Sequence, residues 1–161
     1  SRCKPATGFL LLMLMVALPL PETSKAAQPE YFVRDFPRAQ LIINTRGGHG
    51  CVLFDIYVAQ SPAQRAQGLM HIEAMGQYEG MIFLYPQERP ISMWMKNTLI
   101  SLDMLFVDKQ SKIVSLHADA VPLSETIIDS GVDAVAVIEL NAGSIEYFGI
   151  ETGNRIIFPA G

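Results

Sequence analysis

The chain is poor in cysteine and in positive charge, and both shortages limit what it can be. Of its two cysteines only Cys51 lies beyond residue 26. We therefore expect no internal disulfide in that later part and a packed, unbridged thiol at Cys51. Twelve lysines and arginines stand against 16 aspartates and glutamates, and no basic cluster reverses the balance. A phosphate backbone would be repelled, so we expect no nucleic acid as a partner.

The chain also lacks the short motifs of several common enzyme classes. It has no G-x-S-x-G, no glycine-rich phosphate loop and no H-E-x-x-H. His117 stands alone in "IVSLHADA", which favours a surface residue at a strand end over a metal ligand. We therefore expect no cofactor and no metal site, and no reaction follows from a motif.

The first 26 residues have the anatomy of a secretory signal peptide. Arg2 and Lys4 precede an apolar segment from Phe9 to Leu20, and a small-x-small pattern ends at Ala26. The alternative is a retained anchor, although the segment is short of the ~20 residues that a spanning helix needs. We expect cleavage to leave a periplasmic or secreted domain, residues 27–161, with no stable membrane span. The loss of three positive charges and one negative charge takes the net charge from −4 to −6.

The rest of the chain is divided into short segments that are rich in β-branched and aromatic residues. Most of them are bounded by Pro, Gly, Asn or Asp, which is typical of strands. The glycine-rich "RGGHG" between the first two predicts a hairpin. The expected strands are "QLIINT", "CVLFDIYVA", "MIFLY", "ISMWMK", "LDMLFVD", "KIVSLHA", "AVAVIEL" and "RIIFPA". We expect a single α+β domain, mainly antiparallel β and barrel-like, with one or two short helices.

Two segments carry helix signals. In "SPAQRAQG", Ser61 can cap a helix, Pro62 suits its first position and Gly68 can end it. Gln64 falls where a capping box requires Glu or Gln, so we expect a helix from Pro62 to about Gln67. A second short helix is expected in "NAGSIEYFG", with Asn141 as its cap.

The segment "SMWMKNTLISLDMLF", residues 92–106, places two ionisable groups among apolar residues. We expect a hairpin with its turn at Asn97 and Thr98. Trp94 and Lys96 then project to one side of the first strand, and Asp103 lies in the second. Because a buried, unpaired charge is costly, we expect these charges to be paired.

Glu139 and Arg65 are candidates to join this group. Glu139 interrupts the apolar "AVAVIEL" on the face of Val135 and Val137, and Arg65 lies in the middle of the expected helix. An arginine can hold a carboxylate through two parallel hydrogen bonds. Arg65 is therefore a plausible clamp for Asp103 or for Glu139.

These residues allow three functional interpretations and a structural one. The first is a cleft for a small molecule or peptide segment, formed by Arg65, Trp94, Lys96, Asn97, Thr98, Asp103 and Glu139. The second is a hydrolase or transferase with Asp103 and Glu139 as its acid and base. The third is a Cu(I) site built from methionines, which are also good core fillers. In the structural interpretation, a salt-bridge network only fixes the helix and hairpin to the sheet.

Five segments occur in the order "RAQGLM", "GMIF", "WMKNT", "LDMLF" and "IELNAG". In this order they closely resemble domain-of-unknown-function family 192, and the likeness covers nearly all of residues 27–161. The resemblance implies a compact, mostly β single domain that often follows a signal peptide, with no established activity, substrate or cofactor. Ser101 and Asn154 depart from the usual proline and aspartate. The function that we expect is an exported small binding domain.

Overall fold

The fold consists of strands and short helices in the part of the chain that the computed structural model describes, residues 32, 35–45 and 50–159. The strands are β1 (Arg38–Asn44), β2 (Cys51–Ala59), β3 (Glu79–Met93), β4 (Leu102–Val107), β5 (Ile113–Ala120), β6 (Ile128–Asn141) and β7 (Arg155–Ile157). The helices are α2 (Pro62–Gln67) and α3 (Ser144–Phe148). The expected signal peptide, residues 1–26, lies outside the described residues. Neither of these two helices is long and apolar enough to cross a membrane.

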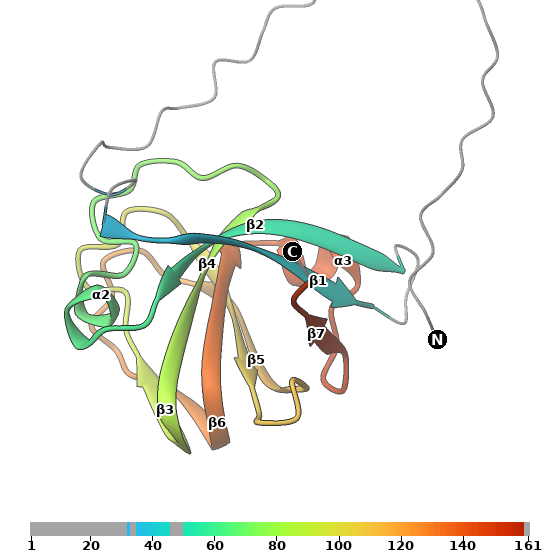
Figure 1. The fold of residues 1–161 in the computed structure, drawn as a ribbon. Coiled ribbons are helices and arrows are strands. Elements are labelled where there is room, and N and C mark those ends of the chain that lie inside the picture. Colours follow the sequence, from blue (N-terminus) through green and yellow to red (C-terminus); the bar gives the residue numbers. More distant parts are fainter. Residues whose placement is uncertain (1–31, 33–34, 46–49, 160–161) are drawn as a thin grey trace, which may run out of the picture.

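These strands form one sheet in the order β5-β4-β6-β3-β2-β1-β7. Neighbouring strands are antiparallel except β2 and β3, which run parallel and are connected through α2. The sheet curls, so that β1 and β2 run across β3 and β6 (Figure 1). An isolated bridge between Lys112 and Arg155 brings β7 beside the start of β5. The expected barrel-like, mainly antiparallel α+β domain is confirmed.

The local signals for the first hairpin and the first helix are also confirmed. β1 and β2 pair in one antiparallel register along the whole of β1. The hydroxyl of Ser61 accepts the backbone N–H of Gln64, and the Gln64 side chain accepts the N–H of Ser61 in return. Gly68 follows the helix with a φ of 49°, a conformation that glycine adopts without a steric penalty. These neighbours in sequence fix the position of α2 and of Arg65 within it.

The hairpin expected over residues 92–106 does not form. "MIFLY" and "ISM" belong to the single long strand β3, with irregular pairing between Leu84 and Ser92 in place of a turn. β3 pairs with β6, and β4 pairs with β5 and β6. The prediction was wrong because β6, which is apolar on both faces, lies between β3 and β4. Lys96 and Asp103 are therefore not cross-strand partners.

Asn141 does not cap the second helix. It is the last residue of β6, and its side-chain amide donates to the backbone carbonyls of Met75 and Gly76, at 3.0 Å each. Gly143 occupies the position before α3, with a φ of 82°. The prediction failed because β6 continues one residue beyond the expected "AVAVIEL" and ends at Asn141 itself.

Cys51 is not packed, because it lies with Leu53 on the exposed face of β2. In the full chain it is disulfide-bonded; an unbridged thiol is expected only after residues 1–26 are removed, and that stays a prediction. The other cysteine of the chain, Cys3, lies outside the described residues. The packing expectation failed because β2 buries the opposite set of side chains, which includes Phe54 and Ile56.

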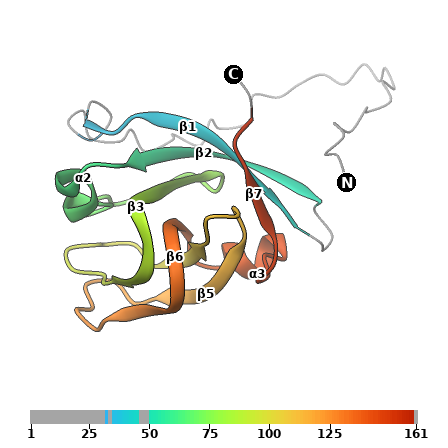
Figure 2. The ribbon, with the colours of Figure 1, turned by 60° about the horizontal axis from the view of Figure 1, so that its bottom comes forward.

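The hydrophobic core has two parts, one on each face of the curled sheet. Met104 and Val137 belong to the first part, whereas the residues that follow them, Leu105 and Ile138, belong to the second. Residues 136–140 of β6 are all buried. Glu139 therefore points to the same side as Val137, into the first part of the core. The helices α2 and α3 lie at opposite ends of the sheet (Figure 2).

Candidate functional site

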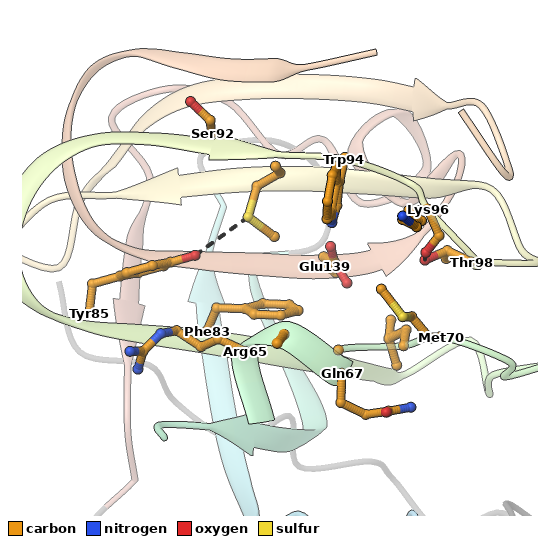
Figure 3. Close-up of a pocket in the computed structure, with 14 residues that line it drawn as sticks. Arg65, Gln67, Met70, Phe83, Tyr85, Ser92, Trp94, Lys96, Thr98 and Glu139 are labelled. Atoms are coloured by element: carbon orange, nitrogen blue, oxygen red, sulfur yellow. Dashed lines mark hydrogen bonds between the residues drawn. The ribbon is translucent and has the colours of Figure 1, made fainter. Parts of the chain in front are cut away.

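A small cavity opens between the end of α2, β3 and the segment that follows β3 (Figure 3). Its volume is about 100 Å³, several times the roughly 10–15 Å³ that holds one water molecule. Five of the seven residues predicted for a ligand site line it: Arg65, Trp94, Lys96, Thr98 and Glu139. The cavity thus has room for a group of a few non-hydrogen atoms.

Glu139 points into this cavity between Trp94 and Phe83 (Figure 3). Its cross-strand neighbours are Met81 of β3 and Met104 of β4, and neither side chain can donate a strong hydrogen bond. Glu139 is only 4% exposed. No described residue donates a hydrogen bond to its carboxyl or forms an ion pair with it. Burial raises the pKa of Glu139 from 4.5 to about 8, because the charged form loses its hydration.

Arg65 lines the cavity but does not hold a carboxylate. Its Nη1 atom donates to the backbone carbonyls of Gln60, at 2.6 Å, and Leu84, at 2.9 Å. The guanidinium carbon lies 5.1 Å from the centre of the Tyr85 ring, and the group points away from Glu139 (Figure 3). The expected clamp is wrong because backbone carbonyls next to α2 satisfy this arginine.

Trp94 and Lys96 lie at the mouth of the cavity, in the segment after β3. Trp94 is 45% exposed, and the Lys96 Nζ atom lies 5.3 Å from the centre of its ring. The hydroxyl of Thr98 is buried and donates to the Lys96 carbonyl at 3.4 Å. Within the described chain Lys96 forms no ion pair, so the pairing expected for this lysine is also wrong.

Asp103 lies on the opposite face of the sheet from the cavity. It is fully buried, and its two carboxylate oxygens accept the backbone N–H groups of Asp119, at 2.9 Å, and Ile145, at 2.8 Å. It pairs across the strands with Leu140, whereas Glu139 pairs with Met104. Asp103 and Glu139 therefore face opposite sides of the sheet and cannot act together as an acid and a base. The structural interpretation expected a salt-bridge network. Among the described residues no ion pair includes Arg65, Lys96 or Asp103, so this network does not form there.

Asn97 does not line the cavity, but it belongs to strained backbone at the mouth. Its φ is 56°, and His71 and Leu123 also have positive φ values, 64° and 61°. The N–H of His71 donates to the carbonyl of Asn97, and the N–H of Leu123 donates to that of Thr98. Positive φ is uncommon outside glycine, and strain of this kind gathers at functional sites.

The sequence analysis missed the aromatic wall of the cavity, which consists of Phe83 and Tyr85 of β3. The Tyr85 hydroxyl donates to the sulfur of Met93 at 3.6 Å. Burial raises the pKa of Tyr85, and the charges of Arg65 and Arg89 oppose this rise. The sequence could have predicted this wall, because the alternation of side chains along "MIFLY" places Phe83 and Tyr85 on one face of the strand.

The methionines divide between the core and the cavity. Met81, Met95 and Met104 are fully buried in the core, and Met70 and Met93 line the cavity. The Met70 sulfur accepts a hydrogen bond from the Asn97 amide at 3.8 Å. In the described part of the chain, no group of three or more His, Cys, Asp or Glu residues is arranged to hold a metal ion.

Comparisons with known proteins confirm the family that the five sequence segments indicated. The model of the family DUF192, described as "Uncharacterized ACR", matches residues 42–158. A candidate transcription regulator from Sinorhizobium meliloti 1021 is 38% identical, with a TM-score of 0.74; the match covers 76% of this chain and 95% of that one. A protein of unknown function from Novosphingobium aromaticivorans DSM 12444 is 30% identical, with a TM-score of 0.75 and coverage of 88% and 100%. No curated protein matches significantly.

Proposed function

This chain belongs to the family DUF192, and from its site we propose that it is an exported binding domain. The cavity that contains Glu139 would hold a small molecule, or the end of a peptide segment. The family description states no ligand, so the proposal depends on the chemistry of the residues that line the cavity.

The observation that carries the proposal is the unpartnered carboxyl of Glu139. The carboxyl is not sealed off, because the only fully buried side-chain N or O atom without a partner among the described residues is Nδ2 of Asn154. Its oxygens face the cavity, and withdrawing a carboxyl that has no protein donor from most of its hydration costs up to about 1–3 kcal/mol. The cross-strand neighbours on either side are Met81 and Met104. An apolar residue of this kind would also be expected at position 139 if that residue served only to pack the core. A ligand that donates to Glu139 would recover this cost when it binds.

Two further features support a binding site. An exposed tryptophan beside buried polar groups is typical of pockets that bind small ligands, and Trp94 and Glu139 provide this combination. The strained residues Asn97 and Leu123 hold the mouth in one conformation through hydrogen bonds at Asn97 and Thr98. A mouth organised before binding reduces the entropy that a ligand loses on binding.

A thermal-shift screen tests this proposal. Small amines, amides and carboxylates would be added to the parent, to Glu139→Gln and to the control Glu146→Gln, an exposed glutamate on α3. We expect at least one compound to raise the melting temperature of the parent and of the control but not of Glu139→Gln, because only native-state binding stabilises. The proposal fails if no compound does so, or if the three proteins respond equally.

A second candidate function follows from the pKa of Glu139. A carboxyl with a pKa of about 8 is half ionised near pH 8 and mostly protonated at pH 7, which suits a general acid that later acts as a base. Asp103 cannot be its partner, so a hydrolase or transferase would use Glu139 alone. Turnover of a compound found in the screen, with loss in Glu139→Gln while binding remains, would favour the enzyme.

Export is the part of the proposal that depends on residues 1–26. The basic start, the short apolar segment and the small-x-small pattern support cleavage after Ala26 or Ala27. The intact mass of the protein recovered from the periplasm or the medium tests this. A mass that still includes Phe9–Leu20 would contradict cleavage and favour an anchored protein.

A further inference from the structure

The lining of the Glu139 cavity narrows the class of ligand, on the premise that the proposed binding function is correct. Phe83, Tyr85 and Trp94 form its aromatic walls, and Glu139 is its buried acidic group. Aromatic faces attract cations, and a carboxylate accepts hydrogen bonds from an ammonium group. We infer that the cavity binds a primary ammonium group carried on an aliphatic stem.

Other ligand groups match these residues less well. An anionic group would meet the Glu139 carboxyl at a distance where like charges repel strongly in a poorly hydrated site. Once the carboxyl is ionised, an uncharged donor would satisfy one oxygen and leave the charge of the carboxylate uncompensated. An ammonium group supplies three donors and the opposite charge in one compact unit, which a cavity of about 100 Å³ can hold.

The cations of the protein itself do not fill this role. Arg65 and Arg89 lie over the ring of Tyr85, at 5.1 and 5.4 Å, and Lys96 lies over Trp94. None of the three pairs with Glu139 within the described structure. Arg65 is held by two backbone carbonyls, and Arg89 is not among the residues that line the cavity. Lys96 is therefore the lining cation whose side chain no described hydrogen bond holds. Its charge should oppose an incoming ammonium group.

Apolar surface inside and outside the cavity indicates an aliphatic stem. Leu69, Met70 and Met93 line the interior. Leu99, 43% exposed, follows Thr98 in sequence, and Leu123, 59% exposed, is hydrogen-bonded through its N–H to the Thr98 carbonyl. These leucines border the mouth at Thr98. A free alkylamine and the side chain of a lysine in a peptide share the required chemistry.

The experiment uses the fluorescence of Trp94, which is the single tryptophan of the chain and lines the cavity. The parent, Glu139→Gln, Lys96→Met and Glu146→Gln would be titrated at pH 8.5 with n-butylammonium, n-butanol and butyrate. We expect saturable binding of n-butylammonium by the parent and Glu146→Gln, with at least tenfold weaker binding by Glu139→Gln. Lys96→Met should bind more tightly than the parent. Circular dichroism would confirm that Glu139→Gln is folded, as we expect because it loses no partner.

A pH series of the same titration distinguishes an ammonium ligand from a neutral one. Glu139 must lose its proton to pair with an ammonium group, so affinity for n-butylammonium should rise with pH between 6 and 8, by up to about tenfold per unit. A ligand that needs the protonated carboxyl would show the opposite slope. The other ionisable groups that line the cavity are Arg65 of α2, Tyr85 of β3 and Lys96 after it.

Two peptides distinguish the sources of the amine. An N-acetylated glycine peptide with one central lysine would be compared with the same peptide carrying an acetylated lysine. If the peptide with the unmodified lysine binds more tightly than n-butylammonium, the natural ligand is a lysine side chain of a partner protein. If it binds equally or more weakly, the natural ligand is a free amine. If n-butanol or butyrate binds as tightly and still requires Glu139, the ammonium inference is wrong and the binding function stands. If no probe and no screened compound binds in the cavity, the ammonium inference and the proposed binding function are both wrong.

Discussion

Asp103 of β4 and Glu139 of β6 lie one residue apart in the register of two paired strands, but they point to opposite faces of the sheet. Asp103 is opposite Leu140, and Glu139 is opposite Met104. The Asp103 carboxylate accepts two backbone N–H groups, whereas Glu139 has no partner among the described residues. Asp103 therefore joins segments of the fold to one another, and Glu139 is available to a ligand.

Replacing Glu139 with an apolar residue should stabilise the domain. We expect Glu139→Met to raise the free energy of unfolding at pH 7 by about 1–3 kcal/mol, because a buried carboxyl without a partner is removed. Urea unfolding with an unchanged m-value would measure this gain. Glu79→Met is the matched control, since Glu79 is equally buried but accepts the Gly76 N–H and pairs with Arg38. It should lose stability, and a similar loss in both variants would show that Glu139 has a structural role.

Glu139 should also make the stability of the parent depend on pH. Its pKa is about 8 in the folded protein and 4.5 ordinarily, so between these values the folded state keeps a proton that the unfolded state has released. The contribution of Glu139 is therefore most favourable below pH 4.5 and falls by about 1.4 kcal/mol per pH unit up to pH 8. Urea unfolding at pH 5, 6, 7 and 8 would show this slope, and the slope should be less steep by this amount in Glu139→Gln. Parallel profiles would contradict the raised pKa.

Asp103→Asn should weaken the fold without changing the cavity. An asparagine side chain would direct an N–H group toward the N–H of Asp119 or Ile145, so one buried donor would lose its acceptor. We expect a loss of about 1–3 kcal/mol in the free energy of unfolding. The emission maximum of Trp94 and the affinity for any ligand of the cavity should stay as in the parent. Lost binding with unchanged stability would place Asp103 in the site after all.

The cap of α2 should contribute measurably to stability. Ser61→Ala removes the acceptor for the Gln64 N–H and should cost about 1 kcal/mol, as is usual for such caps. Ser61→Asp keeps an acceptor at the same position and should retain most of the stability. Thermal unfolding of both variants tests this pair. Equal melting temperatures for Ser61→Ala and the parent would mean that the cap is dispensable.

The sequence by itself determined the features that depend on a few neighbouring residues. The bounds of α2 followed from Ser61, Pro62, Gln64 and Gly68, since a cap and a capping box act within one helical turn. The β1–β2 hairpin followed from a glycine-rich loop between two alternating strands. The family followed from five ordered segments. Trp94, Lys96 and Glu139 of the cavity were also named in advance, because an ionisable or aromatic residue within an apolar segment is conspicuous.

Only the tertiary structure decided which of those residues meet. β6 lies between β3 and β4 because its two apolar faces are buried when it has a strand on each side, and no local pattern specifies that order. This insertion separates Lys96 from Asp103 and brings Glu139 beneath Trp94. Separately, the packing of α2 against β3 places Arg65 on the carbonyls of Gln60 and Leu84. The sequence placed a carboxyl in an apolar strand, but the arrangement of distant strands determined that it has no partner and faces a cavity.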